Sequence, residues 1–311
     1  MTLTIWAKSP ARDHSSYPST PHGEKENTGY PLLPHLLDVA AVASRLQKSI
    51  PCPVELPCSE DWISALVGLH DLGKATPGFQ RKLGLNIPNS AGAPDRHDAS
   101  TVPLLMTQLK QIGVTQSIAH QLSMAVGAHH GSLISSTDFQ RAGLWQFSSD
   151  WLIVHNELFD GLLAGIGVSD LPDLPDNPFT KSSFLQWMMG LTTVADWIGS
   201  SDSICRWERL EQWAGNSKSW FASSIKLADQ SLTDVGITSE SLTENYSGAK
   251  TVAIALNGMK PRPLQDAIVE VIDSLGNEPG LVVIEAPMGE GKTEGGLAFV
   301  PSSRGLYMAM P

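Results

Sequence analysis

Side chains that commonly bind metal ions accompany three apolar stretches of this sequence. The segment GLHDLGKATPGFQ places His70 and Asp71 next to each other, directly after an apolar run. His129 and His130 follow a second apolar stretch, and Asp196 lies within a third. Imidazole and carboxylate groups are common ligands of divalent transition metals. One interpretation is a metal site where helices converge, and the alternative is that polar residues end these helices by chance.

Helical periodicity would bring these residues onto apolar faces, because positions three and four apart share one face of a helix. Each of three expected helices carries one such side chain in its apolar stripe: Ile63, Leu66, Val67 and His70; Ile118, Leu122, Ala125, Val126 and His129; Leu185, Met189, Thr192 and Asp196. A carboxylate buried without a partner is costly, so Asp196 requires a cation or hydrogen-bond donors. A fourth expected helix offers His35 near its beginning.

A single histidine on a helix is more often a core or surface residue than a metal ligand. The doublets His70–Asp71 and His129–His130 are harder to explain in that way, and with Asp196 they favour a shared metal site. Four other histidines have no comparable context and are assigned no function, namely His14, His22, His120 and His155.

The elements expected to position these residues are mainly helical between about residue 31 and residue 222. Apolar residues at helical spacing predict helices over 31–47, 59–73, 116–131 and 183–200. Ser59 is the expected N-cap and Gly73 the expected C-cap of the second helix, and Gly131 is expected to end the third. Residues 1–30 are rich in Pro, Ser, Gly and His and are expected to be irregular.

A different pattern begins near residue 260. The apolar run 281–284 suits a strand buried on both faces, and the glycine-rich segment APMGEGKT follows it, ahead of an expected helix. This context indicates a Walker A phosphate loop that includes Gly289 and Gly291. Its backbone N–H groups would cradle phosphates, Lys292 would reach the β- and γ-phosphates, and Thr293 would bind Mg²⁺.

Composition and charge limit the classes of function. Hydrophobic residues make up 41% of the 311 residues and charged residues 17%, which is typical of a globular protein. The formal net charge is −11, and the nearest basic cluster, Lys74, Arg81 and Lys82, is too small for a stand-alone nucleic-acid-binding domain. An acidic protein can still cut nucleic acid where metal ions neutralise its site. The sequence shows no export signal and no membrane span, and three cysteines without paired spacing indicate a reducing cytoplasm.

The order of the candidate ligands resembles the HD metal-dependent phosphohydrolase superfamily, whose pattern is H…HD…D. The matching residues are His35, His70, Asp71 and Asp196, and the two-metal subset of that superfamily is matched by His97, His129 and His130. More narrowly, the segments WAKS, GYPLLPHLLDVAAVA, GLHDLGKATPGFQ and ADWIGS resemble the HD nuclease domain of the signature nuclease-helicase of type I CRISPR systems. That resemblance covers roughly residues 1–222.

The resemblance implies a mainly α-helical HD bundle with two metal sites that share one carboxylate. One ion would be bound by His35, His70, Asp71 and Asp196, and the other by Asp71, His97, His129 and His130. Mixed imidazole and carboxylate ligands favour Mn, Fe, Co or Ni over Mg. Two ions about 4 Å apart can activate water and stabilise the leaving oxygen of a phosphodiester. Whether one or two ions are bound stays open.

Lys74 is the second candidate catalytic residue after Asp71. It lies one helical turn beyond His70, where it would contact the scissile phosphate or stabilise the transition state. The alternative is that Lys74 is a cation at the C-terminus of a helix and complements the helix dipole. The sequence leaves both roles open.

The resemblance continues into a superfamily 2 helicase. PRPLQ resembles the adenine-sensing Q motif with Gln265 as the reader, and RGLYMAMP (304–311), expected to be a second buried strand, resembles the start of the next helicase motif. The expected organisation is an HD nuclease domain over 1–222, a connecting segment over 223–262 and the N-terminal fragment of an α/β RecA-like lobe over 263–311. No Walker B strand or second lobe follows, so ATP and Mg²⁺ would serve only a longer polypeptide of which this is a fragment.

The implied activity is metal-dependent endonucleolytic hydrolysis of single-stranded DNA in CRISPR interference. The helicase would deliver the strand, and the RNA-guided Cascade complex would recruit the protein in the cytoplasm, without a membrane. Two alternatives stay open: an HD phosphohydrolase of small nucleotides, and a non-catalytic module that docks the helicase onto Cascade. An appended helicase lobe speaks against the first, and seven metal-competent residues speak against the second.

Overall fold

Helices make up nearly all of the regular structure. The computed structural model describes residues 5–9, 29–88, 92–168, 174, 182–237, 247–275, 282–287 and 289–302. The chain divides into two units, Met1–Thr238 and Ser239–Pro311. The elements of the first unit are β1 (Trp6–Lys8), β2 (Tyr30–Pro31), α1 (Leu32–Ser49), α2 (Glu60–Gly68), the 3-10 helix η1 (Leu69–Lys74), α3 (Pro77–Lys82), α4 (His97–Gln111), α5 (Gln116–Gly127), α6 (Ser136–Gly143), α7 (Ser149–Ile166), α8 (Ser182–Gly199), the 3-10 helix η2 (Trp207–Gln212) and α9 (Ser217–Asp234).

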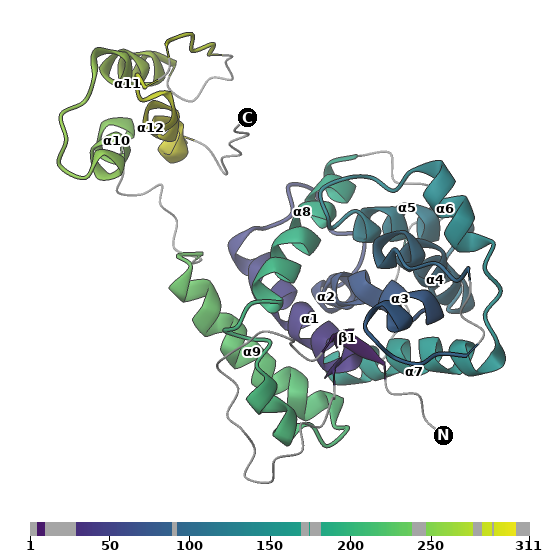
Figure 1. Ribbon diagram of the computed structural model, residues 1–311. Coiled ribbons are helices and arrows are strands. Elements are labelled where there is room, and N and C mark those ends of the chain that lie inside the picture. Colours follow the sequence, from purple (N-terminus) through teal and green to yellow (C-terminus); the bar gives the residue numbers. More distant parts are fainter. Residues whose placement is uncertain are drawn as a thin grey trace. The chain divides into compact units, whose positions relative to one another are not determined.

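Helix α1 is the central element of the first unit. Its sequence is apolar on most sides, as expected of a helix surrounded by others, and 13 of its 18 residues are buried. It packs against α2, α7, α8 and α9. Figure 1 shows α1 and α2 in the middle of this unit, with α8 and α9 on one side and α4, α5 and α6 on the other. The short antiparallel pair β1–β2 leads directly into α1.

Asp38, one turn after His35 in α1, is buried in a network of hydrogen bonds. Its Oδ1 accepts from Arg209 Nη1 at 3.1 Å, Trp220 Nε1 at 3.0 Å and Ser224 Oγ at 2.5 Å. Its Oδ2 accepts from the Tyr30 hydroxyl at 2.9 Å. The donors belong to β2, η2 and α9, so this one carboxylate ties α1 to three other elements.

The predicted helix 59–73 is two elements rather than one. Ser59 is its N-cap as predicted, because its hydroxyl accepts from the Trp62 backbone N–H at 3.3 Å. The α-helix ends at Gly68, and η1 continues the chain as a tighter 3-10 turn. Gly73 is therefore not a C-cap. It lies against the first turn of α4, where a Cβ at Gly73 would collide with the carbonyl oxygen of His97.

The other predicted helices of this unit differ from the structure mainly at their ends. Helix α8 covers the stretch predicted as 183–200. Helix α5 ends at Gly127, so the end predicted at Gly131 is wrong; Gly131 instead has a φ of 82°, which suits glycine, in the turn that follows. The segment predicted as a connection, 223–262, contains the second half of α9, in which Ala228 and Leu232 are buried. The functional division at residues 222 and 262 stays a prediction.

The second unit contains α10 (Gly248–Leu256), α11 (Pro263–Leu275), α12 (Lys292–Gly296) and the 3-10 helix η4 (Leu297–Ser302). Its small core includes Val252, Ile268 and Ala298. The strand predicted at 281–284 is absent from the described residues 282–287, and Val283 is 72% exposed. A parallel strand obtains its hydrogen bonds from neighbouring strands, and the described part of this unit contains none. The α/β character predicted here is thus not found, and the strand predicted at 304–311 lies outside the described residues.

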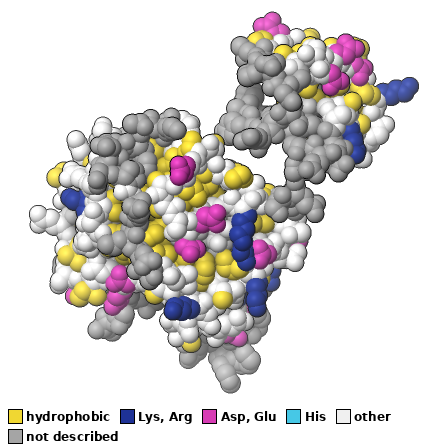
Figure 2. Space-filling view, turned by 180° about the vertical axis from the view of Figure 1, so that it is seen from behind, with side chains coloured by type: hydrophobic (Ala, Val, Ile, Leu, Met, Phe, Trp, Pro, Cys, Tyr) yellow, Lys and Arg dark blue, Asp and Glu magenta, His cyan; other side chains and the backbone are white. Residues whose placement is uncertain are grey.

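The surface of the first unit is mixed in character. Figure 2 shows a strip of hydrophobic side chains on one face of this larger unit, with only scattered Lys and Arg side chains around it. The described residues visible on this face therefore form no basic stripe of the kind that tracks a nucleic-acid backbone. No helix in the described part of the chain is long and apolar enough to span a membrane. Cys52, Cys58 and Cys205 are free thiols.

Candidate metal centre

Asp71 lies at the centre of a buried cluster of imidazole and carboxylate groups in the first unit, with a side chain that is 2% exposed. Its Oδ2 atom lies 3.0 Å from Nε2 of His35 and 3.2 Å from Nε2 of His70. Its Oδ1 atom lies 3.3 Å from Nε2 of His97 and 3.8 Å from Nε2 of His129. The two oxygens of one carboxylate therefore face two different groups of histidines.

Each group could hold one ion. The donor atoms within each lie no more than 4.8 Å apart, and the groups are His35, His70, Asp71 and Asp196, and His97, His129 and His130. Asp196 joins the first group through its Oδ1, 3.2 Å from Nε2 of His70. His130 joins the second through its Nε2, 2.9 Å from Nε2 of His97. The structure thus brings together all seven residues that the sequence predicted as ligands, while their binding of metal stays a prediction.

Five elements converge to build this cluster. His35 comes from the first turn of α1, His70 and Asp71 from η1, His97 from the start of α4, His129 and His130 from the turn after α5, and Asp196 from the last turn of α8. Thr101 of α4 fastens η1 in place, because its hydroxyl donates to the His70 carbonyl at 2.7 Å and accepts from the Gly73 N–H at 2.9 Å. The 3-10 turn of η1 therefore has a fixed position between α2 and α4.

Backbone carbonyls orient two of the imidazoles. Nδ1 of His70 lies 3.1 Å from the Val67 carbonyl oxygen, and Nδ1 of His129 lies 3.1 Å from that of Val126. A carbonyl oxygen can only accept, so Nδ1 is the donor in both. In the neutral form of each ring, Nε2 is then left with a lone pair directed at the cluster, as is usual for a metal-binding histidine.

The buried polar atoms of this cluster fit a bound cation. Three of those that face the cluster have no hydrogen-bond partner among the described residues: Nε2 of His70, Oδ1 of Asp71 and Nε2 of His129. A buried polar atom without a partner costs about 1–3 kcal/mol, which ligation would remove. Nitrogen and oxygen donors in this mixture suit Mn, Fe, Co or Ni. The residues present therefore fit divalent transition-metal ions.

Burial and neighbouring charges shift the pKa values of the cluster in different directions. Burial lowers the pKa of His35 and of His97 to about 4, and that of His129 to about 3, so these rings are neutral near pH 7. Burial also acts to lower the pKa of His70, but the carboxylates of Asp71 and Asp196 outweigh it and raise that pKa to about 10. Among His35, His70, His97 and His129, His70 is therefore the one whose charge balances a carboxylate in the absence of metal.

Lys74 contacts the cluster instead of extending into solvent. Its Nζ lies 2.5 Å from Oδ2 of Asp71, and its side chain is 12% exposed. Burial acts to raise the pKa of Asp71, yet the charges of His70 and Lys74 hold it well below the usual range. Lys74 is thus placed to act on charge at the centre. Contact of Lys74 with a phosphate stays a prediction.

Sequence reasoning missed the residues that support the ligands. The Ser200 hydroxyl donates to Oδ1 of Asp196 at 2.9 Å, and its position four residues after Asp196, directly beyond the end of α8, could have revealed it. Thr101 gave no such signal, because its contact with η1 depends on how two separate segments pack. His155, which was assigned no function, is buried with Nε2 2.7 Å from the Ala75 carbonyl oxygen. His120 lies outside the cluster, and His14 and His22 lie outside the described residues.

The second unit contains the predicted phosphate loop. Gly289 and Gly291 have φ values of 84° and 77°, which side chains rarely adopt, and Gly291 is the N-cap of α12. Nε2 of the buried Gln265 donates to the Gly291 carbonyl oxygen at 3.2 Å. Lys292 and Thr293 begin α12 directly after the loop. The predicted nucleotide-binding residues are therefore adjacent, and nucleotide binding by them stays a prediction.

Lys292 is engaged by the loop itself. Its Nζ donates to the carbonyl oxygens of Ala286 at 2.6 Å and Pro287 at 2.8 Å. Nε2 of Gln265 donates to the Gly291 carbonyl oxygen, and Oε1 of Gln265 accepts from the Arg262 backbone N–H at 2.9 Å. The side chains expected to read a nucleotide thus hold the loop in its present shape.

Comparison with known proteins gives this geometry a family context. A family model described as "Cas3, HD domain" matches residues 6–205. The "CRISPR-associated endonuclease/helicase Cas3" of Thermus thermophilus is 29% identical over an alignment of 342 residues, which covers 99% of this chain and 34% of that protein. The chain spans about a third of the length of the curated relatives it matches.

Solved structures agree in fold. The crystal structure of T. fusca Cas3-AMPPNP is 25% identical with a TM-score of 0.56, over 89% of this chain and 33% of that chain. A chain of a structure described as "CRISPR RNA-guided surveillance complex, pre-nicking" is 23% identical with a TM-score of 0.52, over 97% of this chain and 35% of that one, and shows a likeness of fold alone. The family match covers more than half of the chain and contains all seven clustered residues. The chain belongs to the Cas3 HD-domain family.

Proposed function

We propose that the first unit is a metal-dependent endonuclease that hydrolyses the phosphodiester bonds of single-stranded DNA in CRISPR interference. The observation that supports this most is the position of Asp71, whose Oδ2 and Oδ1 face two separate groups of imidazoles. One carboxylate shared by two ligand groups is suited to two ions held close together, as in two-metal phosphodiesterases. Membership of the Cas3 HD-domain family agrees with this chemistry.

Each residue of the cluster has a part in the proposed reaction. His35, His70, Asp71 and Asp196 would hold one ion, and Asp71, His97, His129 and His130 the other. Two bound ions would lower the pKa of the attacking water and stabilise charge on the leaving oxygen. Asp71 bridges the groups, and Ser200 orients Asp196. Lys74, one of whose contacts is Asp71, would place its positive charge against the scissile phosphate.

The strand enters from the exposed side of the cluster in this proposal. His35 and His70 are fully buried, whereas the side chain of His97 is 20% exposed, that of Asp196 is 16% exposed and His130 is exposed. Asp196 and His97 belong to different ion groups, so each ion group includes a ligand that reaches solvent. A phosphate on the exposed side could contact both ions without rearrangement of the buried ligands.

The names of the relatives support a proposal about partners. We propose that residues 263–311 begin a RecA-like lobe of a superfamily 2 helicase that binds ATP and Mg²⁺ through Gln265, Gly289, Gly291, Lys292 and Thr293. The T. thermophilus relative is named an endonuclease/helicase, and one structural neighbour is described as an RNA-guided surveillance complex. Delivery of the strand by a helicase recruited to Cascade, in the cytoplasm, would reconcile a net charge of −11 with a DNA substrate.

The test is cleavage of circular single-stranded DNA by the metal-stripped protein. Mn²⁺, Co²⁺, Ni²⁺ or Mg²⁺ is added singly, without ATP, to the wild-type chain and to Asp71→Ala. His120→Ala is the matched control, because His120 is an exposed histidine outside the cluster. A circular substrate has no ends, so its cleavage demonstrates an endonuclease.

The expected result is cleavage with a transition metal by the wild type and by His120→Ala, and none by Asp71→Ala. Absence of cleavage with every metal, in folded protein that binds metal, would contradict the nuclease. Hydrolysis of nucleoside phosphates by that protein would then support the small-nucleotide alternative. Retained partner binding in Asp71→Ala, without hydrolysis by either protein, would support the docking alternative.

A further inference from the structure

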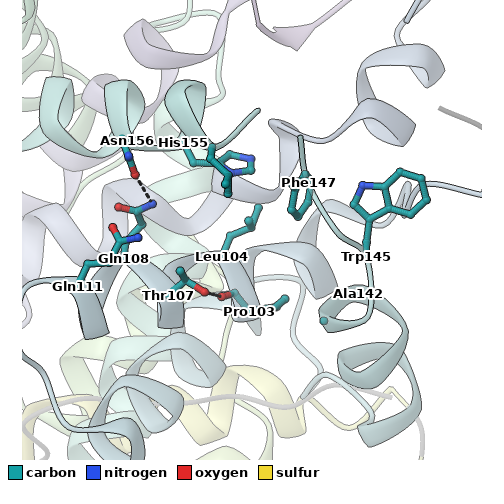
Figure 3. Close-up of a pocket in the computed structure, with 12 residues that line it drawn as sticks. Pro103, Leu104, Thr107, Gln108, Gln111, Ala142, Trp145, Phe147, His155 and Asn156 are labelled. Carbon is teal, nitrogen blue, oxygen red and sulfur yellow. Dashed lines mark hydrogen bonds between the residues drawn. The ribbon is translucent and has the colours of Figure 1, made fainter. Parts of the chain in front are cut away.

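The first unit contains a pocket whose lining includes none of the seven clustered residues. It has a volume of about 240 Å³ and lies between α4, the segment after α6, and α7. Its walls include Leu104, Gln108, Trp145, Phe147 and Asn156. Figure 3 shows Gln108 and Asn156 at one end of this pocket, and Phe147 and Trp145 toward the other. None of its residues was assigned a function from the sequence.

One end of the pocket presents neutral hydrogen-bonding groups. Nε2 of Gln108 donates to Oδ1 of Asn156 at 2.9 Å, which leaves the Gln108 Oε1 as an acceptor beside the Asn156 NH₂ as a donor. Gln111 adds a third carboxamide (Figure 3). None of the described lining residues is Asp, Glu, Lys or Arg, and burial lowers the pKa of His155 so that it is neutral as well. The pocket therefore favours a neutral ligand with adjacent donors and acceptors.

The other end is aromatic. Trp145 and Phe147 are partly buried, and the Phe147 ring packs edge-on against His155 with centroids 4.8 Å apart. The buried Leu104 lies in the wall of the pocket as well. A planar ring that carries hydrogen-bonding groups on its edge matches both ends at once. Nucleobases have this form: aromatic side chains stack on their faces, and carboxamides pair with their edges.

The pocket is connected to the metal centre through two elements. His155 in its wall has Nε2 2.7 Å from the carbonyl oxygen of Ala75, the residue after Lys74. Pro103, another lining residue, lies six residues along α4 from His97, or about 9 Å at 1.5 Å per residue. A strand bound at the centre would have its neighbouring nucleotides at distances of this order.

We propose that this pocket binds one unpaired nucleobase of the strand that is cleaved at the metal centre. Trp145 stacks on the face of the base, and Gln108 and Asn156 pair with its edge. This inference rests on the proposed nuclease function and adds a subsite to it. Because the base is bound away from the reacting phosphate, the pocket contributes to substrate binding and leaves the chemical step unchanged.

The test compares steady-state cleavage of a single-stranded oligonucleotide by the metal-loaded full chain and its variants. Loss of base stacking costs about 1–3 kcal/mol, so Trp145→Ala is expected to raise KM about 5- to 150-fold with kcat nearly unchanged. Trp145→Phe should retain most of the affinity. Leu144→Ala is the matched control, because Leu144 is 81% exposed, adjacent in sequence and outside the lining. Asn156→Ala, at an exposed position, gives a second variant that should also raise KM.

The same oligonucleotide with abasic positions separates base binding from other effects. Its KM with the wild type should approach that of Trp145→Ala, and the variant should no longer distinguish the two substrates. The proposal is overturned if Trp145→Ala and Asn156→Ala leave KM within twofold of the wild type, or if they raise it equally for both substrates. Wild-type protein that cleaves neither substrate would instead contradict the nuclease function itself.

Discussion

Asp71 is the buried negative charge around which the cluster is arranged. Its carboxylate is almost fully buried, and an uncompensated charge in such a place is strongly unfavourable. His70 and Lys74 provide positive charge at Oδ2, while Oδ1 has no hydrogen-bond partner among the described residues. The charge of Oδ2 is therefore compensated by neighbouring cations, whereas Oδ1, which has no hydrogen-bond partner, faces His97 and His129.

Replacement of Lys74 by methionine distinguishes its two proposed roles. If Lys74 stabilises charge on the phosphate, Lys74→Met should lower kcat by about 10²–10³-fold, the usual cost of one preorganised electrostatic contact. The number of bound metal ions should not change. Lys82→Met, at an exposed position on α3, is the control for a lost surface charge. An unchanged kcat with a lower free energy of unfolding would assign Lys74 to the helix dipole or to Asp71.

The free energy of unfolding of the metal-free protein should depend on pH in two opposite ways. The pKa of His35 and His97 is about 4 and that of His129 about 3, below 6.5 in the unfolded chain, so the unfolded state binds more protons below pH 6.5. Stability is thus lost as the pH falls from 6.5 toward 4. The pKa of His70 is about 10, so its stabilising contribution is lost as the pH rises from 6.5 through 10.

Urea unfolding between pH 4 and pH 10 checks this prediction. Stability should be greatest near pH 6.5, and His70→Asn should remove the decline on the alkaline side. His120→Asn, at an exposed position outside the cluster, should leave the profile unchanged. A flat profile in the wild type would show that the metal-free cluster opens to water.

At the scale of elements, the close approach of η1 to α4 positions the second group of ligands. A Cβ at Gly73 would collide with the His97 carbonyl oxygen and lie 2.5 Å from the Thr101 nitrogen. Gly73→Ala should therefore lower the free energy of unfolding by about 1–3 kcal/mol and weaken metal binding, since His97 must move. Gly190→Ala on α8, where a Cβ would meet nothing within 4 Å, should instead stabilise by roughly 0.5–1 kcal/mol.

Chemical unfolding and metal titration of the two glycine variants measure the predicted changes in the free energy of unfolding and in metal affinity. Equal effects of Gly73→Ala and Gly190→Ala would mean that the contact between η1 and α4 is easily relaxed. A loss of stability without any loss of metal affinity would show that His97 is not held by this contact.

The position of α1, and with it His35, depends on the network around Asp38. Arg209→Met removes the cation that faces this buried carboxylate, and breaking such a pair typically costs about 3–5 kcal/mol. Arg45→Met is a matched control, because Arg45 also joins α1 to α9, through Asp229 at 2.9 Å. Both side chains of that pair reach solvent, so its loss should cost about 0.2–1 kcal/mol. Comparable losses in the two variants would contradict a special role for Asp38.

The sequence predicted which residues cluster better than it predicted the elements that carry them. Helical spacing placed His70, His129 and Asp196 on apolar faces shared with core residues. The resemblance to HD phosphohydrolases added His35, His97 and His130, and the structure brings all of these residues together with Asp71. The change from α2 to η1 was not predictable, since an apolar pattern does not distinguish a 3-10 turn from the end of an α-helix. The strand expected at 281–284 failed for another reason: a strand needs a neighbour, and local hydrophobicity does not supply one.

At the scale of the whole molecule, the folded first unit extends beyond the family match. The match ends at residue 205, whereas Arg209, Trp220 and Ser224, which surround Asp38, come from η2 and α9. A chain of residues 1–205 would leave Asp38 buried without these three donors. The pocket beside α7 could not be predicted from the sequence either, because its walls come from three separate segments.

A chain of residues 1–237 is therefore expected to unfold cooperatively and bind metal, while a chain of residues 1–205 is not. Near-ultraviolet circular dichroism and metal titration of the two chains check this. Similar behaviour of both would show that the α9 contacts are dispensable for the cluster.

The unequal burial of the two ligand groups has a consequence for how the protein would acquire its ions. His35 and His70 have no exposure at all, whereas His130 of the other group is open to solvent. An ion held by His35, His70, Asp71 and Asp196 would have Asp196, 16% exposed, as its most exposed ligand, so we expect it to exchange more slowly than an ion held beside the exposed His130. The ion of the His35 group would then remain the metal that was bound when the chain folded. The ion of the His130 group would change with the metal that is available at the time.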